Sequence, residues 1–174
     1  MADNRTVCID SCVVISFLKG GTDRIPSDVP ILKGLFSDIH QGRINVLFPT
    51  ILRTELMECN LGSELKKQFE QLTNLDNFDE IVVNSRIAEV ASQIRSFYKA
   101  ENQRTQAVPI LAPMDCIFLA TAIVENCPVL FTYDGDRQSP SKPRKLLALK
   151  GPIAGEYPLD IRKPQSFMDG LHGI

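Results

Sequence analysis

Short apolar runs and longer amphipathic stretches follow one another along the chain. Runs of apolar and β-branched residues predict strands at residues 6–10, 43–50, 80–84, 128–134 and 158–164. Apolar residues at helical spacing, or in runs of helical length, predict helices at residues 12–20, 30–42, 51–60, 63–75, 85–100 and 114–127. Strands that alternate with helices are typical of parallel βαβ units. We therefore predict an α/β protein, a three-layer α/β/α sandwich around a central parallel sheet.

Polar residues sharpen the boundaries of two of these helices. Ser11 is the expected N-cap of the first helix, because its hydroxyl can accept a hydrogen bond from the first turn. Asn84 or Ser85 is the expected start of the helix with the clearest apolar spacing in the chain. We expect that helix to end in the polar, proline-containing stretch at residues 101–113.

Length and composition indicate one globular domain. The chain has 174 residues and a formal net charge of −2, so we expect a single domain over residues 1–174 and no nonspecific coating of nucleic acid. No apolar run approaches the roughly 20 residues of a membrane span, and no secretory signal is visible at the start. The five cysteines favour reduced core thiols. We expect a cytoplasmic protein without a membrane partner.

One segment near the carboxyl end is basic. Lys142, Arg144, Lys145 and Lys150 lie within residues 137–155 and form a run without an intervening acid. Two interpretations stay open: the run is a solvated loop and helix face, or it contacts the phosphates of a nucleic acid. Under the second interpretation, Lys142, Arg144 and Lys145 are the candidate RNA-binding residues.

A few acidic residues occupy positions that are unusual for surface charges. Asp10 and Asp134 end predicted strands, Glu55 lies in a partly apolar helix after a strand, and Asp115 opens the most hydrophobic helix. Each has an ordinary alternative when taken alone. Asp115 can favour the positive end of its helix, Glu55 can face solvent, and Asp134 can form a turn with the glycine after it.

Considered together, these acids predict a shared cleft. The carboxyl ends of parallel strands meet at one edge of a sheet, and the helices that follow run back from that edge. Two like charges about 4 Å apart repel by roughly 4 kcal/mol at an effective dielectric constant near 20. A divalent cation removes that repulsion, and an all-carboxylate site suits Mg²⁺ or Mn²⁺. Zinc is disfavoured, because the chain has only His40 and His172 and no CxxC pair.

At these residues the chain resembles a PIN domain of the VapC toxin type. Four segments carry the resemblance in the expected order: "VCIDSCVVISFL", "VLFPTILRTELME", "APMDCIFLATAI" and "LFTYDGDR". A fifth, "PLDIRKPQSF", is similar to the closing strand of the family. The resemblance covers most of the chain, which is longer than the compact toxins, mainly after Asp136.

The resemblance implies a metal-dependent endoribonuclease, the toxin of a type II toxin–antitoxin pair. It implies Mg²⁺ or Mn²⁺ as cofactor, RNA as substrate, a homodimer, and a small antitoxin protein as partner. The implied catalytic residues and metal ligands are Asp10, Glu55, Asp115 and Asp134, with Asp136 as an accessory acid and with Ser11 and Thr132 as polar residues behind them. Because Arg137 replaces a frequent phenylalanine, the choice between Asp134 and Asp136 as main ligand stays open.

Alternatives to the toxin role remain. The extra length is compatible with a PIN-domain nuclease in RNA processing that has no toxin role. A non-catalytic PIN-fold binding module is a second alternative, and the complete set of acids argues against it. A haloacid-dehalogenase-like phosphatase requires a second aspartate two residues after the first, where this chain has Cys12.

Overall fold

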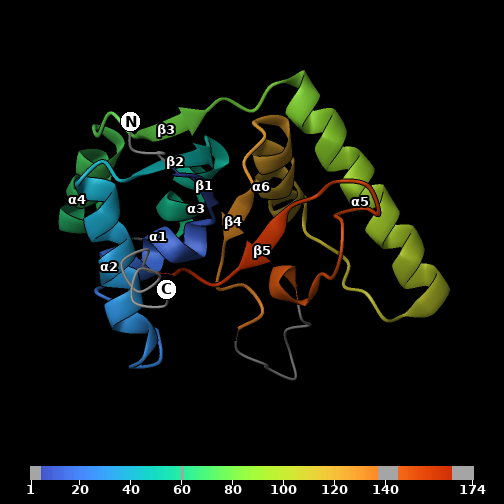
Figure 1. Cartoon of the computed structure of the whole chain (residues 1–174), viewed down its shortest axis with the longest axis horizontal. Coiled ribbons are helices and arrows are strands. Elements are labelled where there is room, and N and C mark those ends of the chain that lie inside the picture. The colour runs from blue at the N-terminus through green and yellow to red at the C-terminus, as the bar shows by residue number, and fades with distance from the viewer. Residues whose placement is uncertain (1–4, 60, 137–144, 166–174) are drawn as a thin grey trace, which may run out of the picture.

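A parallel sheet forms the centre of the molecule. The computed structural model describes residues 5–59, 61–136 and 145–165, and within these ranges the sheet has five strands in the order β3-β2-β1-β4-β5 (Figure 1). Every neighbouring pair is parallel. The strands are β1 (Arg5–Ile9), β2 (Ile44–Pro49), β3 (Phe78–Ile81), β4 (Val129–Phe131) and β5 (Asp160–Arg162).

Helices cover both faces of this sheet. Figure 1 shows one group on one side and two helices, α5 and α6, on the other. The first group comprises α1 (Ser11–Leu18), α2 (Asp28–His40), α3 (Ile51–Glu58) and α4 (Ser63–Thr73). The second comprises α5 (Ser85–Thr105) and α6 (Pro113–Val124), and a short 3₁₀ helix, η1 (Leu146–Ala148), precedes β5. The predicted three-layer α/β/α sandwich is confirmed.

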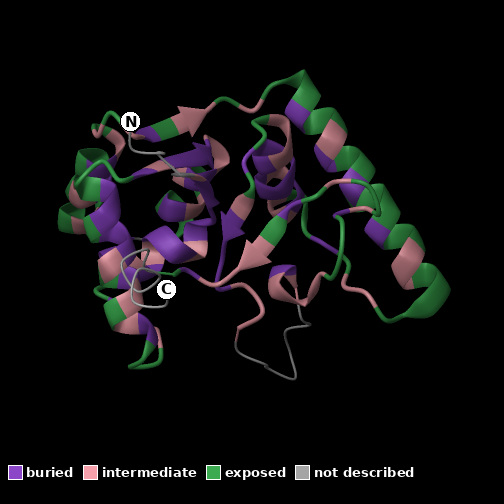
Figure 2. Cartoon of the chain, in the orientation of Figure 1, coloured by how far each residue is buried: buried purple, intermediate pink, exposed green. Residues whose placement is uncertain are grey.

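Two hydrophobic cores explain why β1 is apolar on both faces. Successive side chains of a strand point to opposite faces. Val7 and Ile9 therefore pack with α1–α4, whereas Cys8 packs with α5 and α6. All three side chains are buried, as are most residues of the inner strands (Figure 2). A strand buried on both faces holds the residue that follows it in a fixed position.

Several element boundaries differ from the sequence-based prediction; the β4 strand, for example, ends at Phe131 and not at Asp134. Asp10, in an extended conformation, occupies the N-cap position of α1, and Ser11 is already helical. The α5 helix continues through the polar stretch to Thr105, because exposed polar residues are compatible with a helix; it ends where Gln106 takes a left-handed conformation. The β3 strand begins earlier than expected, since the buried Phe78 pairs with Val46.

The order in which the chain adds strands to the sheet reverses beside β1, which makes this position a topological switch point. The chain moves outward from β1 to β2 and β3, then crosses over through α5 and α6 to place β4 on the other side of β1. In open α/β sheets, ligands bind where the strand order reverses, at the carboxyl ends of the strands. The residues after β1 and β4 therefore lie where this fold places binding sites.

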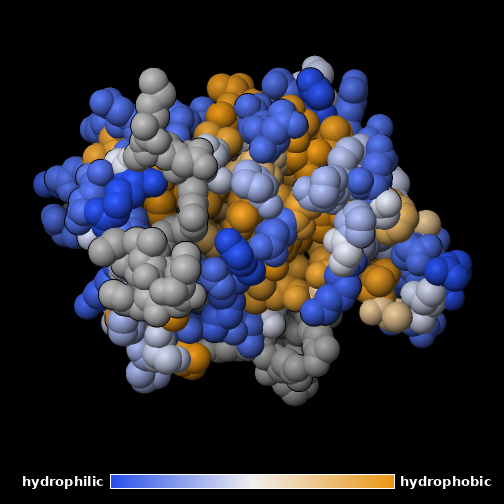
Figure 3. Space-filling model, viewed as in Figure 1, coloured by the Kyte–Doolittle hydropathy of each residue, from blue (hydrophilic) through white to orange (hydrophobic). Residues whose placement is uncertain are grey.

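The surface in the view of Figure 3 combines polar and apolar areas. Hydrophobic residues gather in the middle of this face, between more polar areas on either side (Figure 3). Within the described ranges, no helix has both the length and the apolar character needed to cross a membrane.

Candidate functional site

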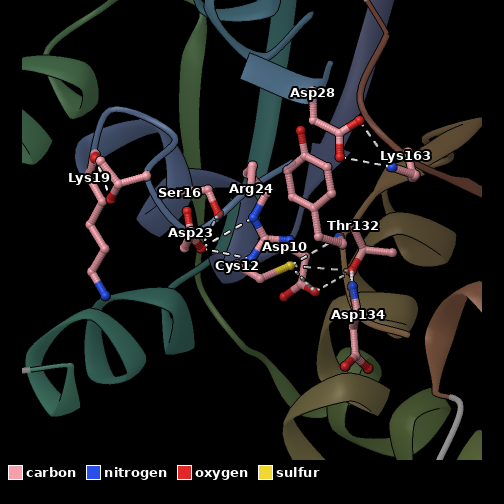
Figure 4. A network of polar contacts seen from close by, with 12 residues as sticks. Asp10, Cys12, Ser16, Lys19, Asp23, Arg24, Asp28, Thr132, Asp134 and Lys163 are labelled. Carbon is pink, nitrogen blue, oxygen red and sulfur yellow. Dashed lines mark hydrogen bonds and ion pairs between the residues drawn. The ribbon is translucent and has the colours of Figure 1, made fainter. Parts of the chain in front are cut away.

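Asp10 is the best-anchored acid at the switch point. Its backbone N–H donates to the carbonyl of Phe131, which ties the end of β1 to the end of β4. The Thr132 hydroxyl donates to Asp10 Oδ2 at 2.6 Å and accepts the backbone N–H of Asp134 at 2.8 Å (Figure 4). The Ser11 hydroxyl donates to Asp10 Oδ1 at 3.3 Å. Thr132 and Ser11 thus both donate hydrogen bonds to the Asp10 carboxylate.

Cys12 is a further partner of Asp10 that the sequence pattern did not single out. Its Sγ donates to Asp10 Oδ2 at 3.1 Å and accepts the backbone N–H of Tyr133 at 3.2 Å (Figure 4). The thiol therefore links the first turn of α1 to the segment after β4. Burial, and then the charge of Asp10, raise the pKa of Cys12, so the thiol stays protonated and can donate.

Glu55 approaches the site from α3. The side chains three residues before it and one residue after it, Leu52 and Leu56, are buried and fix the inner face of this helix. Burial raises the pKa of Glu55; the Ser11 hydroxyl opposes that rise, and the charges of Asp10 and Asp115 add to it. Its Oε2 atom is buried without a hydrogen-bond partner within the described part of the chain. A buried carboxylate oxygen of this kind needs a cation or a proton.

Asp115 reaches the site from the first turn of α6. Pro113 occupies the first position of this helix, and the Asp115 carboxylate accepts the backbone N–H of Ala112 at 3.1 Å. Burial raises the pKa of Asp115 to about 6. Among the charges, Lys145 lowers this pKa, whereas Asp134 and Asp10 raise it. Asp115 therefore serves as a helix cap and also faces the other acids.

The two acids after β4 have different surroundings. Asp134 lies beside Thr132 and affects the pKa of Asp115, so it belongs to the same group as Asp10. Asp136 instead pairs with Lys163, whose Nζ lies 3.1 Å from Asp136 Oδ1. The same ammonium lies 2.9 Å from Asp28 Oδ2, an acid buried at the start of α2 (Figure 4). The pair with Lys163 holds the loop after β4 against α2.

Arg24 and Tyr133 form another contact, which links the segment after α1 to the segment after β4. The Arg24 guanidinium lies 4.4 Å from the centre of the Tyr133 ring and donates to Asp23, which also accepts the Ser16 hydroxyl (Figure 4). These residues lie far apart in the sequence, and no motif connects them. They support the backbone that carries Thr132 without belonging to the acidic group.

The basic segment can be located only in part. Lys142 and Arg144 lie outside the described residues, so their predicted RNA contact stays a prediction. Lys145 is described, and its Nζ lies 3.8 Å from Asp134 Oδ1. Because its charge also lowers the pKa of Asp115, Lys145 faces the acids themselves.

The acids suit a hard divalent cation by their chemistry. The donors are carboxylate oxygens, and Glu55 Oε2 is buried without a partner among the described residues. Burial, and to a smaller extent the other acids, raise the pKa values of Glu55 and Asp115. As the side chains stand, no three acidic, cysteine or histidine residues in the described ranges converge closely enough to hold a metal ion. These residues have the donor type that a hard divalent ion prefers, and they lie near one another. Binding requires their carboxylates to turn toward the ion.

Thr132 provides a first test of how the site is held together. Thr132 is fully buried, so its replacement by valine leaves the Asp10 carboxylate and the Asp134 N–H each without one hydrogen bond. We expect Thr132→Val to lower the free energy of unfolding by about 2 kcal/mol. Thr132→Ser keeps the hydroxyl and is the matched control. Urea unfolding at pH 7 distinguishes the two, and equal stability of the valine and serine variants would contradict the bridging role.

Comparison with known proteins identifies the family. The family model described as PIN domain matches residues 7–141, which is more than half of the chain. Curated proteins yield no match. Among solved structures, the chain is similar to the crystal structure of FitAcB from Neisseria gonorrhoeae, with 15% identity, a TM-score of 0.55, and coverage of 91% of this chain and 97% of that chain.

A second solved structure is also similar, although more distantly. It is VapBC2 from Rickettsia felis bound to a DNA fragment from their promoter, with 13% identity, a TM-score of 0.49, and coverage of 73% of this chain and 86% of that chain. At such low identities, the likeness to FitAcB supports the fold and no more. The match of the family model, together with the acids that follow β1, β2 and β4, shows that this chain belongs to the PIN domain family.

Proposed function

We propose that this protein is a Mg²⁺- or Mn²⁺-dependent endoribonuclease and acts as the toxin of a type II toxin–antitoxin pair. Membership of the PIN domain family supports a nuclease function. The observation that carries the metal-dependent assignment is the electrostatic coupling of Asp10, Glu55, Asp115 and Asp134 at the switch point of the sheet. Acids in this arrangement are unfavourable without a cation, and a divalent cation can assist the hydrolysis of a phosphodiester.

The ligands would come from separate elements. Asp10 follows β1, Glu55 lies on α3, Asp115 on α6, and Asp134 follows β4. We propose Asp134 as the main ligand after β4, because it lies beside Thr132 and interacts with Asp115, whereas Asp136 is paired with Lys163. An accessory role of Asp136 stays a prediction.

The chemistry follows from these ligands. A bound divalent ion supplies a water of lowered pKa and stabilises negative charge on the phosphate. The chain itself restricts the orientation of the Asp10 carboxylate through hydrogen bonds from Thr132, Cys12 and Ser11. Because water is the nucleophile, the 2′-hydroxyl takes no part, and products carry a 5′-phosphate and a 3′-hydroxyl.

The partners belong to the same proposal. The toxin role rests on the resemblance of the acidic motifs to those of VapC-type toxins. We propose a homodimer and a small antitoxin protein as partners, and Lys142 and Arg144 of the basic segment as a guide for the RNA backbone.

Cleavage of a defined RNA tests the enzymatic assignment. The purified protein is incubated with a mixed-sequence RNA and with single-stranded DNA of the same sequence, in Mg²⁺, Mn²⁺ or a chelator. We expect internal cuts in the RNA with either metal and at least about 100-fold slower cutting in the chelator, because the acids then lack their cation. End-specific ligation and sequencing reads the product termini.

Two outcomes would contradict the assignment. Cutting that continues at full rate in the chelator would exclude the metal-dependent reaction. Products with 2′,3′-cyclic phosphate ends would show that the 2′-hydroxyl, and not water, is the nucleophile.

A further inference from the structure

Lys145 is a fixed cation beside the acids. Its Nζ lies 3.8 Å from Asp134 Oδ1, and the side chain is 35% exposed. Among the charges of the described residues, its ammonium has the largest effect on the pKa of Asp115, which it lowers against the rise caused by burial. A lysine that merely guided a nucleic acid along the surface would face solvent, whereas this ammonium faces two of the proposed metal ligands.

The backbone around Lys145 is clamped onto the segment after β4. The N–H of Leu147 donates to the carbonyl of Asp134 at 3.1 Å, and the N–H of Leu146 lies 3.4 Å from Asp134 Oδ2. Leu146 is fully buried in the core formed with α5 and α6. Gly135 has a φ of +92°, and a Cβ atom there would lie 3.3 Å from the Lys145 nitrogen. These contacts hold the backbone at Lys145 beside Asp134.

The position of Lys145 affects how many metal ions the acids can bind. Four carboxylates repel one another, and cations must offset that repulsion. One divalent ion together with one ammonium offsets most of the charge of four acids. A second divalent ion would have to lie close to the ammonium, which repels it. A built-in lysine therefore reduces the number of metal ions that the acids can hold.

We infer that Lys145 takes the place of a second metal ion, so that this site binds a single divalent cation. The inference rests on the proposed function, because it takes the four acids as ligands. The ammonium remains beside Asp134 and Asp115, where it stabilises negative charge without leaving the protein. In this role Lys145 is a positioning residue that acts through the acids.

Titration with Mn²⁺, followed by the electron paramagnetic resonance of the free ion, tests the inference. We expect the wild-type protein to bind one Mn²⁺. Lys145→Met should bind its first Mn²⁺ at least about tenfold more tightly, because a nearby positive charge has been removed, and should bind a second ion at millimolar concentration. Lys145→Arg should restore single-ion binding. Lys150→Met, which removes an exposed charge from the same segment, is the matched control.

The direction of the change in Mn²⁺ affinity distinguishes this role of Lys145 from a structural role and from a phosphate contact. A lysine with a merely structural role would weaken Mn²⁺ binding when removed, which is opposite to the expected tightening. If Lys145→Met matched the wild type in stoichiometry and affinity and lost only affinity for RNA, Lys145 would be a phosphate contact and the inference would be wrong. Two ions in the wild-type protein would overturn it as well.

Failure of the inference can be told apart from failure of the proposed function. A wild-type protein that binds Mn²⁺ and cuts RNA, with an unchanged Lys145→Met variant, would leave the nuclease assignment intact and remove only the role of Lys145. A wild-type protein that binds no Mn²⁺ would remove both.

Discussion

Replacement of Asp10 by asparagine is expected to slow RNA cleavage by at least about 1,000-fold, which corresponds to roughly 4 kcal/mol of lost transition-state stabilisation. Asparagine removes the negative charge from the proposed metal ligand that Ser11, Cys12 and Thr132 hold in place. It keeps nearly the same shape and an oxygen that can accept the Thr132 hydroxyl. Stability should therefore change little while activity disappears. Single-turnover cleavage in Mn²⁺ and urea unfolding measure the two effects separately.

A matched variant controls for the substitution itself. Asp79→Asn makes the same chemical change at an exposed position on β3, away from the acids at the switch point. We expect this variant to cleave at the wild-type rate. An Asp10→Asn protein that retained a rate within about tenfold of wild type would exclude Asp10 as an essential ligand, because loss of even a supporting group around a metal typically costs 10–100-fold.

The order of strands and helices could be predicted from the sequence because each core element has a strong apolar pattern. The β1 strand is buried on both faces, so its residues form a continuous apolar run that is visible in the sequence. The positions that were misjudged are at element ends, where the pattern is weak. The α5 helix continues through an exposed polar stretch, and Ser11 is inside α1 because Asp10 takes the cap position.

The candidate ligands could be predicted for a similar reason. Asp10 and Asp134 follow strands that the sequence predicts, and parallel strands bring their carboxyl ends to one edge. The supporting contacts could not be predicted, because they join residues that are far apart in the sequence. Nothing in the sequence pairs Lys163 with both Asp28 and Asp136, or places Lys145 beside Asp134.

The contacts of Cys12 could be predicted from the sequence only in part. Its position two residues after Asp10, in the first turn of the helix, was visible in the sequence. Its bond from the Tyr133 N–H depends on how β4 lies beside β1, which the topology determines. A thiol in an apolar segment resembles an ordinary core residue until the neighbouring strand is known.

In the metal-free protein, Asp115 is expected to contribute less and less to stability as the pH rises from about 4 to about 6. Burial raises the pKa of Asp115 from an ordinary 3.8 to about 6, so in this window the folded state binds a proton that the unfolded state has released. The contribution of Asp115 to stability is highest below this range and falls as the pH rises through it. A shift of this size corresponds to at most about 3 kcal/mol, and partial exposure of the side chain reduces that figure.

Asp115→Asn should remove this loss, since an amide does not ionise. In a chelator at pH 7 we expect the variant to be about 1–2 kcal/mol more stable than the wild type, because asparagine keeps the acceptor for the Ala112 N–H but gives up a favourable charge at the start of α6. Saturating Mn²⁺ should reverse the order, because an ion at about 100 times its dissociation constant stabilises the wild type by roughly 2.7 kcal/mol.

Urea unfolding from pH 4 to pH 8, with and without Mn²⁺, measures both effects, and Asp76→Asn at an exposed loop position is the control. If the wild type and Asp115→Asn showed the same pH dependence in the chelator, Asp115 would not be the strained acid of this site, and the cation would be balancing a different charge.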